Sequence, residues 1–86
     1  MENNDQQVPR PETPTFGMKA VGITFNPGGM PSVDRCKMMH ANCIDQMNAL
    51  RNDPVATPEQ KRLASIAITE MQGAQMWAVK ALTWKD

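Results

Sequence analysis

The sequence predicts an all-α protein: an antiparallel two-helix hairpin with an extended N-terminal arm, assembled as a homo-oligomer. Two stretches with helical periodicity, about 32–51 and about 57–83, are separated by the helix breaker NDPVA at 52–56. Apolar residues surround most of the second stretch, so a single partner helix cannot cover it. Because a chain of 86 residues is too short to bury this helix alone, we expect self-association.

The composition excludes several classes of function. Nine Lys and Arg residues balance nine Asp and Glu residues, so no net field attracts DNA, RNA or an acidic membrane. The sequence shows neither a leader pattern nor a run of about eighteen apolar residues, and we expect neither secretion nor a membrane span. Cys36 and Cys43 lie on one expected helix with a rise of roughly 10 Å between them, too far for a disulfide. The chain therefore fits a reducing cytoplasm.

The N-terminal part carries no helical periodicity. Residues 1–15 contain three prolines and predict a disordered tail. Residues 16–31 predict an extended arm, in which the β-branched AVGITF at 20–25 favours at most one short strand. NPGG at 26–29 predicts a turn that leads into the hairpin domain at 32–86.

The first helix is expected to begin after Ser32, a favourable N-cap residue, and to end at about Arg51. Helical spacing predicts one face packed in the core and the opposite face in solvent. The predicted packed face comprises Cys36, His40, Cys43, Met47 and Leu50, with Val33 and Ile44 at its flanks. The predicted solvated face comprises Arg35, Lys37, Asn42, Asp45 and Asn48.

The second helix has clear boundary signals. Thr57 is the predicted N-cap, Pro58 takes the first helical position, and Gln60 completes a capping box. Nothing interrupts the helix before about Thr83, although Gly73 costs about 1 kcal/mol relative to Ala. On a helical wheel the main polar residues share a sector of about 80°. They are Arg62, Ser65, Thr69, Gln72 and Lys80.

Two groups of residues are candidates for binding an anionic ligand. Arg62, Ser65 and Thr69 form a ridge of phosphate-binding donors, and copies around a rotation axis would ring a symmetric anion. The alternative is a solvated Arg62, with both hydroxyls bonded to carbonyls of their own helix. Phe25 beside the NPGG turn could stack on a base while Lys37 meets a phosphate. The alternative is that Phe25 covers the hairpin core and Lys37 is solvated.

Evidence for other chemistry is weaker. Cys36, His40 and Cys43 are zinc-ligand types at helical spacing, but a structural zinc site needs a fourth ligand and the chain has no other Cys or His. A core stripe with a buried imidazole is the favoured explanation. His40 has no neighbouring Ser or acid that suggests a triad, and no Walker or Rossmann glycine pattern occurs. We therefore expect no enzymatic activity, no cofactor and no metal.

A pattern along the second helix points to a known family. It consists of an Arg near the helix start, a small hydroxyl residue, T-x-x-Q, a Met and a basic end. The matching residues are Arg62, Ser65, Thr69, Gln72, Met76 and Lys80. This helix resembles the C-terminal helix of small phage proteins that sequester immune signalling nucleotides, the anti-CBASS and anti-Thoeris sponges. CKMM and IDQMNAL in the first helix are also similar, so the resemblance covers about 32–83.

This resemblance implies a hexamer of hairpins, without enzymatic activity, that binds cyclic di- or trinucleotides and sometimes cyclic ADP-ribose isomers. It implies one pocket between subunits near the arm, for cyclic dinucleotides or cyclic ADP-ribose species. Phe25 and Lys37 match that pocket by position, although the anti-CBASS members carry a Tyr-containing segment where this chain has GITFNPGG. It implies a second pocket around a three-fold axis for cyclic trinucleotides, matched by Arg62, Thr69 and the adjacent Ser65.

The leading hypothesis is a phage-type sponge in the cytoplasm of the infected bacterial host. Such a protein binds a cyclic messenger without cleaving it and lowers the free messenger by mass action. One rival hypothesis is a structural or adaptor helical-hairpin oligomer with no small-molecule ligand. A more distant rival is a zinc-binding regulatory hairpin that uses Cys36, His40 and Cys43.

Overall fold

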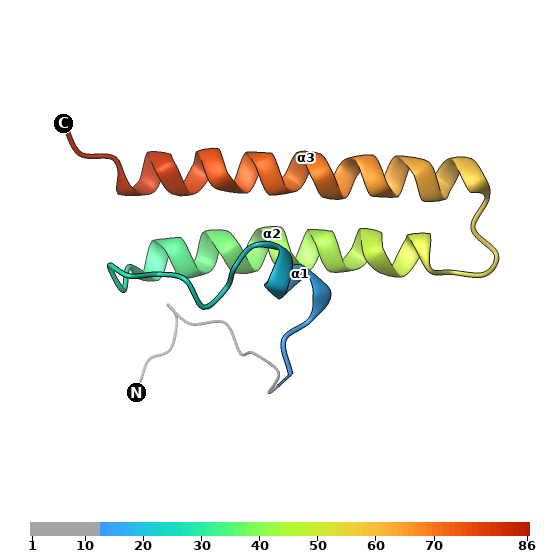
Figure 1. The fold of residues 1–86 in the computed structure, drawn as a ribbon, viewed down its shortest axis with the longest axis horizontal. Coiled ribbons are helices and arrows are strands. Elements are labelled where there is room, and N and C mark those ends of the chain that lie inside the picture. The colour runs from blue at the N-terminus through green and yellow to red at the C-terminus, as the bar shows by residue number, and fades with distance from the viewer. Residues whose placement is uncertain (1–12) are drawn as a thin grey trace.

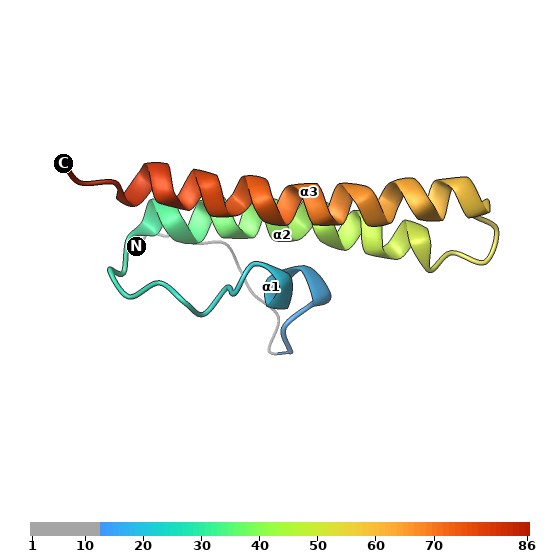
Figure 2. The same ribbon diagram turned by 45° about the horizontal axis from the view of Figure 1, so that its top comes forward.

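The computed structural model describes residues 13–86, so most of the predicted disordered tail lies outside the described residues. It contains three helices, α1 (Phe16–Ala20), α2 (Pro31–Arg51) and α3 (Pro58–Thr83), and residues 13–86 form no strand. Helices α2 and α3 lie side by side and antiparallel, and the short α1 packs against α2 (Figure 1, Figure 2). The predicted all-α hairpin is confirmed for one chain.

The arm differs from its prediction as an extended segment, because its first residues form helix α1. Thr15 caps this helix, with its Oγ1 accepting a hydrogen bond from Met18 N at 3.1 Å. Val21 and Ile23 of the predicted strand are buried in the core instead. A lone strand would leave its backbone groups unpaired, whereas here Ile23 N donates to Met18 O at 3.0 Å. The prediction of a strand was wrong for this reason.

The close approach of α1 to α2 depends on Gly17. Its backbone N–H donates to Asp45 Oδ1 at 2.6 Å, so Asp45 anchors the arm, although it was predicted to be solvated. A Cβ atom on Gly17 would overlap the carbonyl oxygen of Ala41. A side chain at position 17 would therefore push α1 off α2.

The start of α2 also differs from the prediction. Met30 is the N-cap and Pro31 takes the first helical position, so the predicted cap at Ser32 was wrong. Pro is favoured at the first helical position because its φ is already helical and its missing N–H would have no partner there. The end of α2 at Arg51 agrees with the prediction.

The packed face of α2 is rotated from the predicted one. The buried residues of α2 are Val33, Lys37, Met38, Ala41 and Ile44. Cys43 is exposed, and Cys36 and His40 are half-buried. The observed face lies about one residue further along the helix, a rotation of about 100°. The reason is that both the arm and α3 pack on α2, and they select the sector that becomes buried.

The hydrophobic core joins the arm to both long helices. It consists of Met18, Val21, Ile23, Met38, Ala41, Ile44 and Ile68. Only Ile68 comes from α3, whereas the arm and α2 contribute three residues each. The core is therefore centred on the contact between the arm and α2.

Helix α3 follows its boundary signals. Thr57 Oγ1 accepts from Gln60 N at 3.1 Å, and Gln60 Oε1 accepts from Thr57 N at 2.8 Å, which confirms the predicted capping box. Only Ala64, Ile68 and Gln75 of α3 are buried within the chain. Its large apolar residues that stay exposed are Leu63, Ile66, Met76, Trp77 and Leu82. One neighbouring helix covers only a narrow stripe of α3, as the helical wheel predicted.

In the part of the chain that the structure describes, no helix combines the length and the apolar character needed to cross a membrane.

The glycine contact gives a test of the fold. Gly17→Ala should destabilise the protein by about 1–3 kcal/mol, because the added methyl group overlaps the Ala41 carbonyl. The matched control is Gly28→Ala, where the nearest atom to the new Cβ would be Met30 Cγ at 3.7 Å. We expect this control to change the free energy of unfolding by less than about 0.5 kcal/mol. Thermal and urea unfolding measure both variants, and equal effects would contradict the docking of α1.

Candidate functional site

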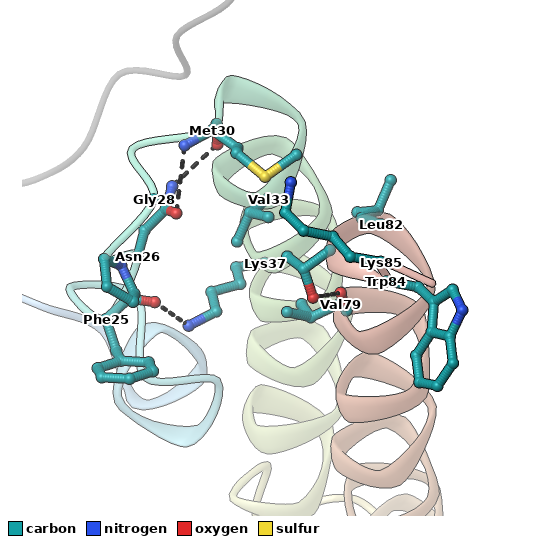
Figure 3. Close-up of a pocket in the computed structure, with 12 residues that line it drawn as sticks. Phe25, Asn26, Gly28, Met30, Val33, Lys37, Val79, Leu82, Trp84 and Lys85 are labelled. Carbon is teal, nitrogen blue, oxygen red and sulfur yellow. Dashed lines mark hydrogen bonds between the residues drawn. The ribbon is translucent and has the colours of Figure 1, made fainter.

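A pocket of about 370 Å³ lies at the end of the hairpin where α2 begins and α3 ends (Figure 3). We call it the arm pocket. One wall comes from the arm and the first turns of α2: Phe25, Asn26, Pro27, Gly28, Met30, Val33 and Lys37. The other wall comes from the end of α3 and the residues after it: Val79, Leu82, Thr83, Trp84 and Lys85. Antiparallel packing of the two long helices brings these walls together (Figure 1).

Lys37 ties the arm to α2 and lines the arm pocket. Its Nζ donates to Gly22 O at 2.8 Å and to Phe25 O at 2.5 Å. The residue is only 4% exposed, so its prediction as part of a solvated face was wrong. Burial lowers the pKa of Lys37, while the nearby charge of Asp34 acts in the opposite direction. An ammonium has three N–H donors, so the two carbonyls leave one N–H without a carbonyl partner.

Phe25 presents an open aromatic face beside this ammonium. The residue is 71% exposed, and its ring centroid lies 5.4 Å from Lys37 Nζ. Such exposure does not fit a side chain that covers the hairpin core. A flat ring next to a cation is an arrangement that can hold a base and an adjoining phosphate. The two residues that the sequence paired are therefore brought together.

The turn between Phe25 and α2 is fixed by the side chain of Asn26. Its Nδ2 donates to Met30 O at 2.9 Å and to Asp34 Oδ1 at 3.1 Å, and its Oδ1 accepts from Met30 N at 3.3 Å. Gly29 adopts a φ of 62°, a left-handed conformation that favours glycine. The predicted NPGG turn is confirmed, and these bonds hold one wall of the pocket in place.

Within one chain, the side chains of the Arg62, Ser65 and Thr69 ridge are already bonded to other protein groups. The Arg62 guanidinium is engaged by Glu59, with Nε at 2.9 Å and Nη2 at 2.7 Å from its two carboxylate oxygens. Thr69 Oγ1 donates to the Ser65 carbonyl at 3.3 Å, as the alternative of bonding within the helix predicted. Ser65 Oγ accepts from Arg51 Nη1 at 3.2 Å. The three predicted ligands therefore share a ridge without converging on one point.

The cysteines and the histidine of α2 do not form a cluster of ligands. Cys36 Sγ lies 3.7 Å from His40 Nδ1, and this nitrogen lies 2.8 Å from the Cys36 carbonyl oxygen. Cys43 is a free, exposed cysteine. Among residues 13–86, no three or more His, Cys, Asp or Glu side chains are placed to hold a metal ion.

With the hairpin and the arm pocket described, the comparison with known families becomes informative. The family model for the Acb2/Tad1 hairpin domain matches residues 18–83. The chain belongs to the Acb2/Tad1 hairpin family. The match covers α2, α3 and most of the arm. Members of the Acb2/Tad1 family are sponge-type binding proteins rather than known enzymes, and membership implies an anti-defence role. No curated protein and no solved structure matches the chain.

The sequence analysis missed the wall of the arm pocket that α3 supplies. The missed lining residues are Val79, Leu82, Thr83, Trp84 and Lys85, together with Asn26 on the arm side. A usable signal was present, because two antiparallel helices joined by a short connection place the last turn of one beside the first turn of the other.

The placement of the α2 cysteines can be tested by their reactivity. We expect Cys43 to react with iodoacetamide before Cys36 at about pH 8, because burial raises the pKa of the Cys36 thiol and lowers its thiolate fraction. Mass spectrometry of peptides after timed alkylation measures the order. In denaturant, as the control, the two thiols should react at similar rates. Faster modification of Cys36 in the folded protein would contradict this assignment of the α2 faces.

Proposed function

We propose that this Acb2/Tad1 hairpin protein is a phage-type sponge. It binds and sequesters cyclic oligonucleotide or cyclic ADP-ribose immune messengers without cleaving them, and it suppresses anti-phage signalling in the cytoplasm of the infected bacterial host. The observation that carries the proposal is the preset pair of Phe25 and Lys37 in the arm pocket of a chain from this family.

The geometry supports binding of a nucleotide in the arm pocket. A base would stack on the exposed Phe25 ring, and a phosphate oxygen would accept the remaining N–H of Lys37. Val33, Val79 and Leu82 supply apolar surface that would shield this contact from water. Because the Asn26 turn and the Lys37 bonds already hold one wall, little ordering cost remains at binding, which favours tight association.

The chemistry of the lining residues supports sequestration rather than cleavage. Hydrolysis of a phosphodiester needs a group that activates water, such as His, Asp or Glu, or a metal that such groups hold. None of the twelve lining residues is His, Cys, Asp or Glu. A pocket of this composition holds a phosphate without supplying a base to attack it.

We further propose that the protein acts as a homo-oligomer, with the hexamer implied by the family resemblance as the expected form. Met76 is 65% exposed and Trp77 is 72% exposed on α3, and Leu63 and Ile66 in the first half of the same helix are also exposed. An apolar surface of this extent on a small protein is typical of an interface. The arm pocket, at about 370 Å³, is near the lower limit for ligand sites, so a neighbouring subunit could enlarge it.

The ridge on α3 is proposed as a second site, for cyclic trinucleotides. Copies of Arg62, Ser65 and Thr69 around a three-fold axis would surround a ligand of the same symmetry. Within one chain, the Glu59 pair and the bond within the helix also fit an oligomer whose ridge binds nothing. The proposed trinucleotide site therefore forms only when several copies of the chain assemble. Mutation of the ridge distinguishes it from an adaptor oligomer that binds no small molecule.

The main test is a ligand panel with the full chain. We expect cyclic di-AMP, cyclic di-GMP, cyclic tri-AMP or cyclic ADP-ribose isomers to raise the melting temperature, and heat denaturation to release the bound compound intact. Phe25→Ala should weaken a ligand of the arm pocket by about tenfold through lost stacking, whereas Phe25→Trp retains it. Light scattering on the same samples measures the oligomer. A folded monomer would contradict the assembly, and no shift with any compound would contradict the sponge.

If the ridge binds cyclic trinucleotides, substitutions of Arg62 and of its partner Glu59 should change the affinity in opposite directions. Arg62→Ala should weaken cyclic tri-AMP binding because it removes the guanidinium. Glu59→Gln should strengthen the same binding by about two- to fivefold, because a trinucleotide would no longer compete with a carboxylate for Arg62. Isothermal titration measures both affinities, and cyclic dinucleotide binding is the control that neither variant should change. Unchanged trinucleotide binding in both variants would show that the ridge does not bind the ligand.

A further inference from the structure

We infer that the segment after α3 belongs to the arm pocket, and that Lys85 supplies a second phosphate contact across from Lys37. This inference rests on the proposed function and deepens it. It assigns the arm pocket to a ligand with a planar base and two separated anionic groups.

The end of α3 places Lys85 at the pocket. The helix ends at Thr83, and Trp84 adopts an extended backbone with φ of −62° and ψ of 137°, so the chain leaves the helix axis there. Thr83 Oγ1 donates to Val79 O at 2.8 Å within this last turn. Lys85 lines the pocket, and Figure 3 shows its side chain extending from the end of α3 toward Met30, across the pocket from Phe25.

The Lys85 ammonium is available to a ligand. Within residues 13–86 no carboxylate pairs with Lys85. The neighbouring carboxylate of Asp86 accepts instead from Trp84 Nε1 at 2.9 Å. Lys85 therefore brings a positive charge without a direct ion pair to the pocket, at a position where a bound phosphate would pair with it.

The two lysines define what the pocket can recognise. Lys37 and Lys85 are the only charged residues among the twelve that line it, and they come from opposite walls. Most of the remaining lining is apolar, with the Phe25 ring open at one side. Two cations on opposite walls suit the two separated phosphates of a cyclic dinucleotide better than the directly linked phosphates of a cyclic ADP-ribose isomer. A ligand with a single anionic group would leave one lysine unused.

This contact is a feature of the chain beyond the family match. The Acb2/Tad1 hairpin match covers residues 18–83 and ends before Trp84 and Lys85. The antiparallel hairpin nevertheless brings residues after Thr83 to the first turns of α2, where Lys37 lies. The segment after α3 thus adds selectivity to a pocket whose other wall lies within the matched domain.

The test compares Lys85→Gln with wild type and with Lys61→Gln, a charge-matched control in the first turn of α3 at the opposite end of the hairpin. Cyclic di-AMP, cyclic di-GMP and cyclic ADP-ribose are titrated at several NaCl concentrations. We expect Lys85→Gln to weaken the ligand that wild type binds by about tenfold, and to reduce the dependence of its affinity on salt. Lys85→Arg should stay within about twofold of wild type, and Lys61→Gln should match wild type.

Two further measurements distinguish a direct contact of Lys85 with the ligand from an effect of Lys85 on the fold. Ligand-free melting temperatures should be unchanged in all three variants, and cyclic tri-AMP binding should be unaffected by Lys85→Gln. Equal affinity and equal salt dependence in Lys85→Gln and wild type would overturn the assignment of Lys85 while leaving the sponge intact. A wild-type protein that binds none of the compounds would instead contradict the proposed function itself.

Discussion

The hydrogen bonds from Lys37 to the arm carbonyls of Gly22 and Phe25 are the interaction on which the candidate pocket depends. They fix the loop that carries Phe25 and the Asn26 turn against the first turns of α2. Burying an ammonium is costly, and the two carbonyl bonds offset that cost while leaving one donor unused. The same charge that closes the arm on the helix therefore also makes the pocket attractive to an anion.

The second constraint is the unequal covering of the two long helices. Both α3 and the arm cover α2, so α2 supplies the centre of the core. Helix α3 packs mainly on α2 and touches the arm only at its edge, and its buried residues are Ala64, Ile68 and Gln75. A chain of this length does not have enough surface to cover both helices fully. This shortage leaves apolar residues of α3 exposed within one chain, and it connects the marginal size of the domain to the proposed assembly.

The two proposed sites differ in how much of each is formed within one chain. The arm pocket has both walls in the same chain, so Phe25 and Lys37 already lie together and Lys85 faces them from the other wall. The ridge on α3 has its Arg62 held by Glu59, its Thr69 hydroxyl bonded within the helix and its Ser65 hydroxyl bonded to Arg51 of α2. A pocket between segments of one chain forms on folding, whereas a ring around an axis forms only on assembly. Selectivity for di- and trinucleotides would thus arise at different levels of structure.

The sequence by itself determined the features that depend on neighbours a few residues away. The Thr57 capping box, the NPGG turn and the narrow polar sector of α3 were all readable, because capping and periodicity are local. Only the tertiary structure decided that the arm begins as a helix, that Lys37 is buried, and that Lys85 reaches the pocket. These features depend on which distant segments pack on α2, and the Gly17 contact with Ala41 shows how closely they pack. No spacing rule along one helix contains that information.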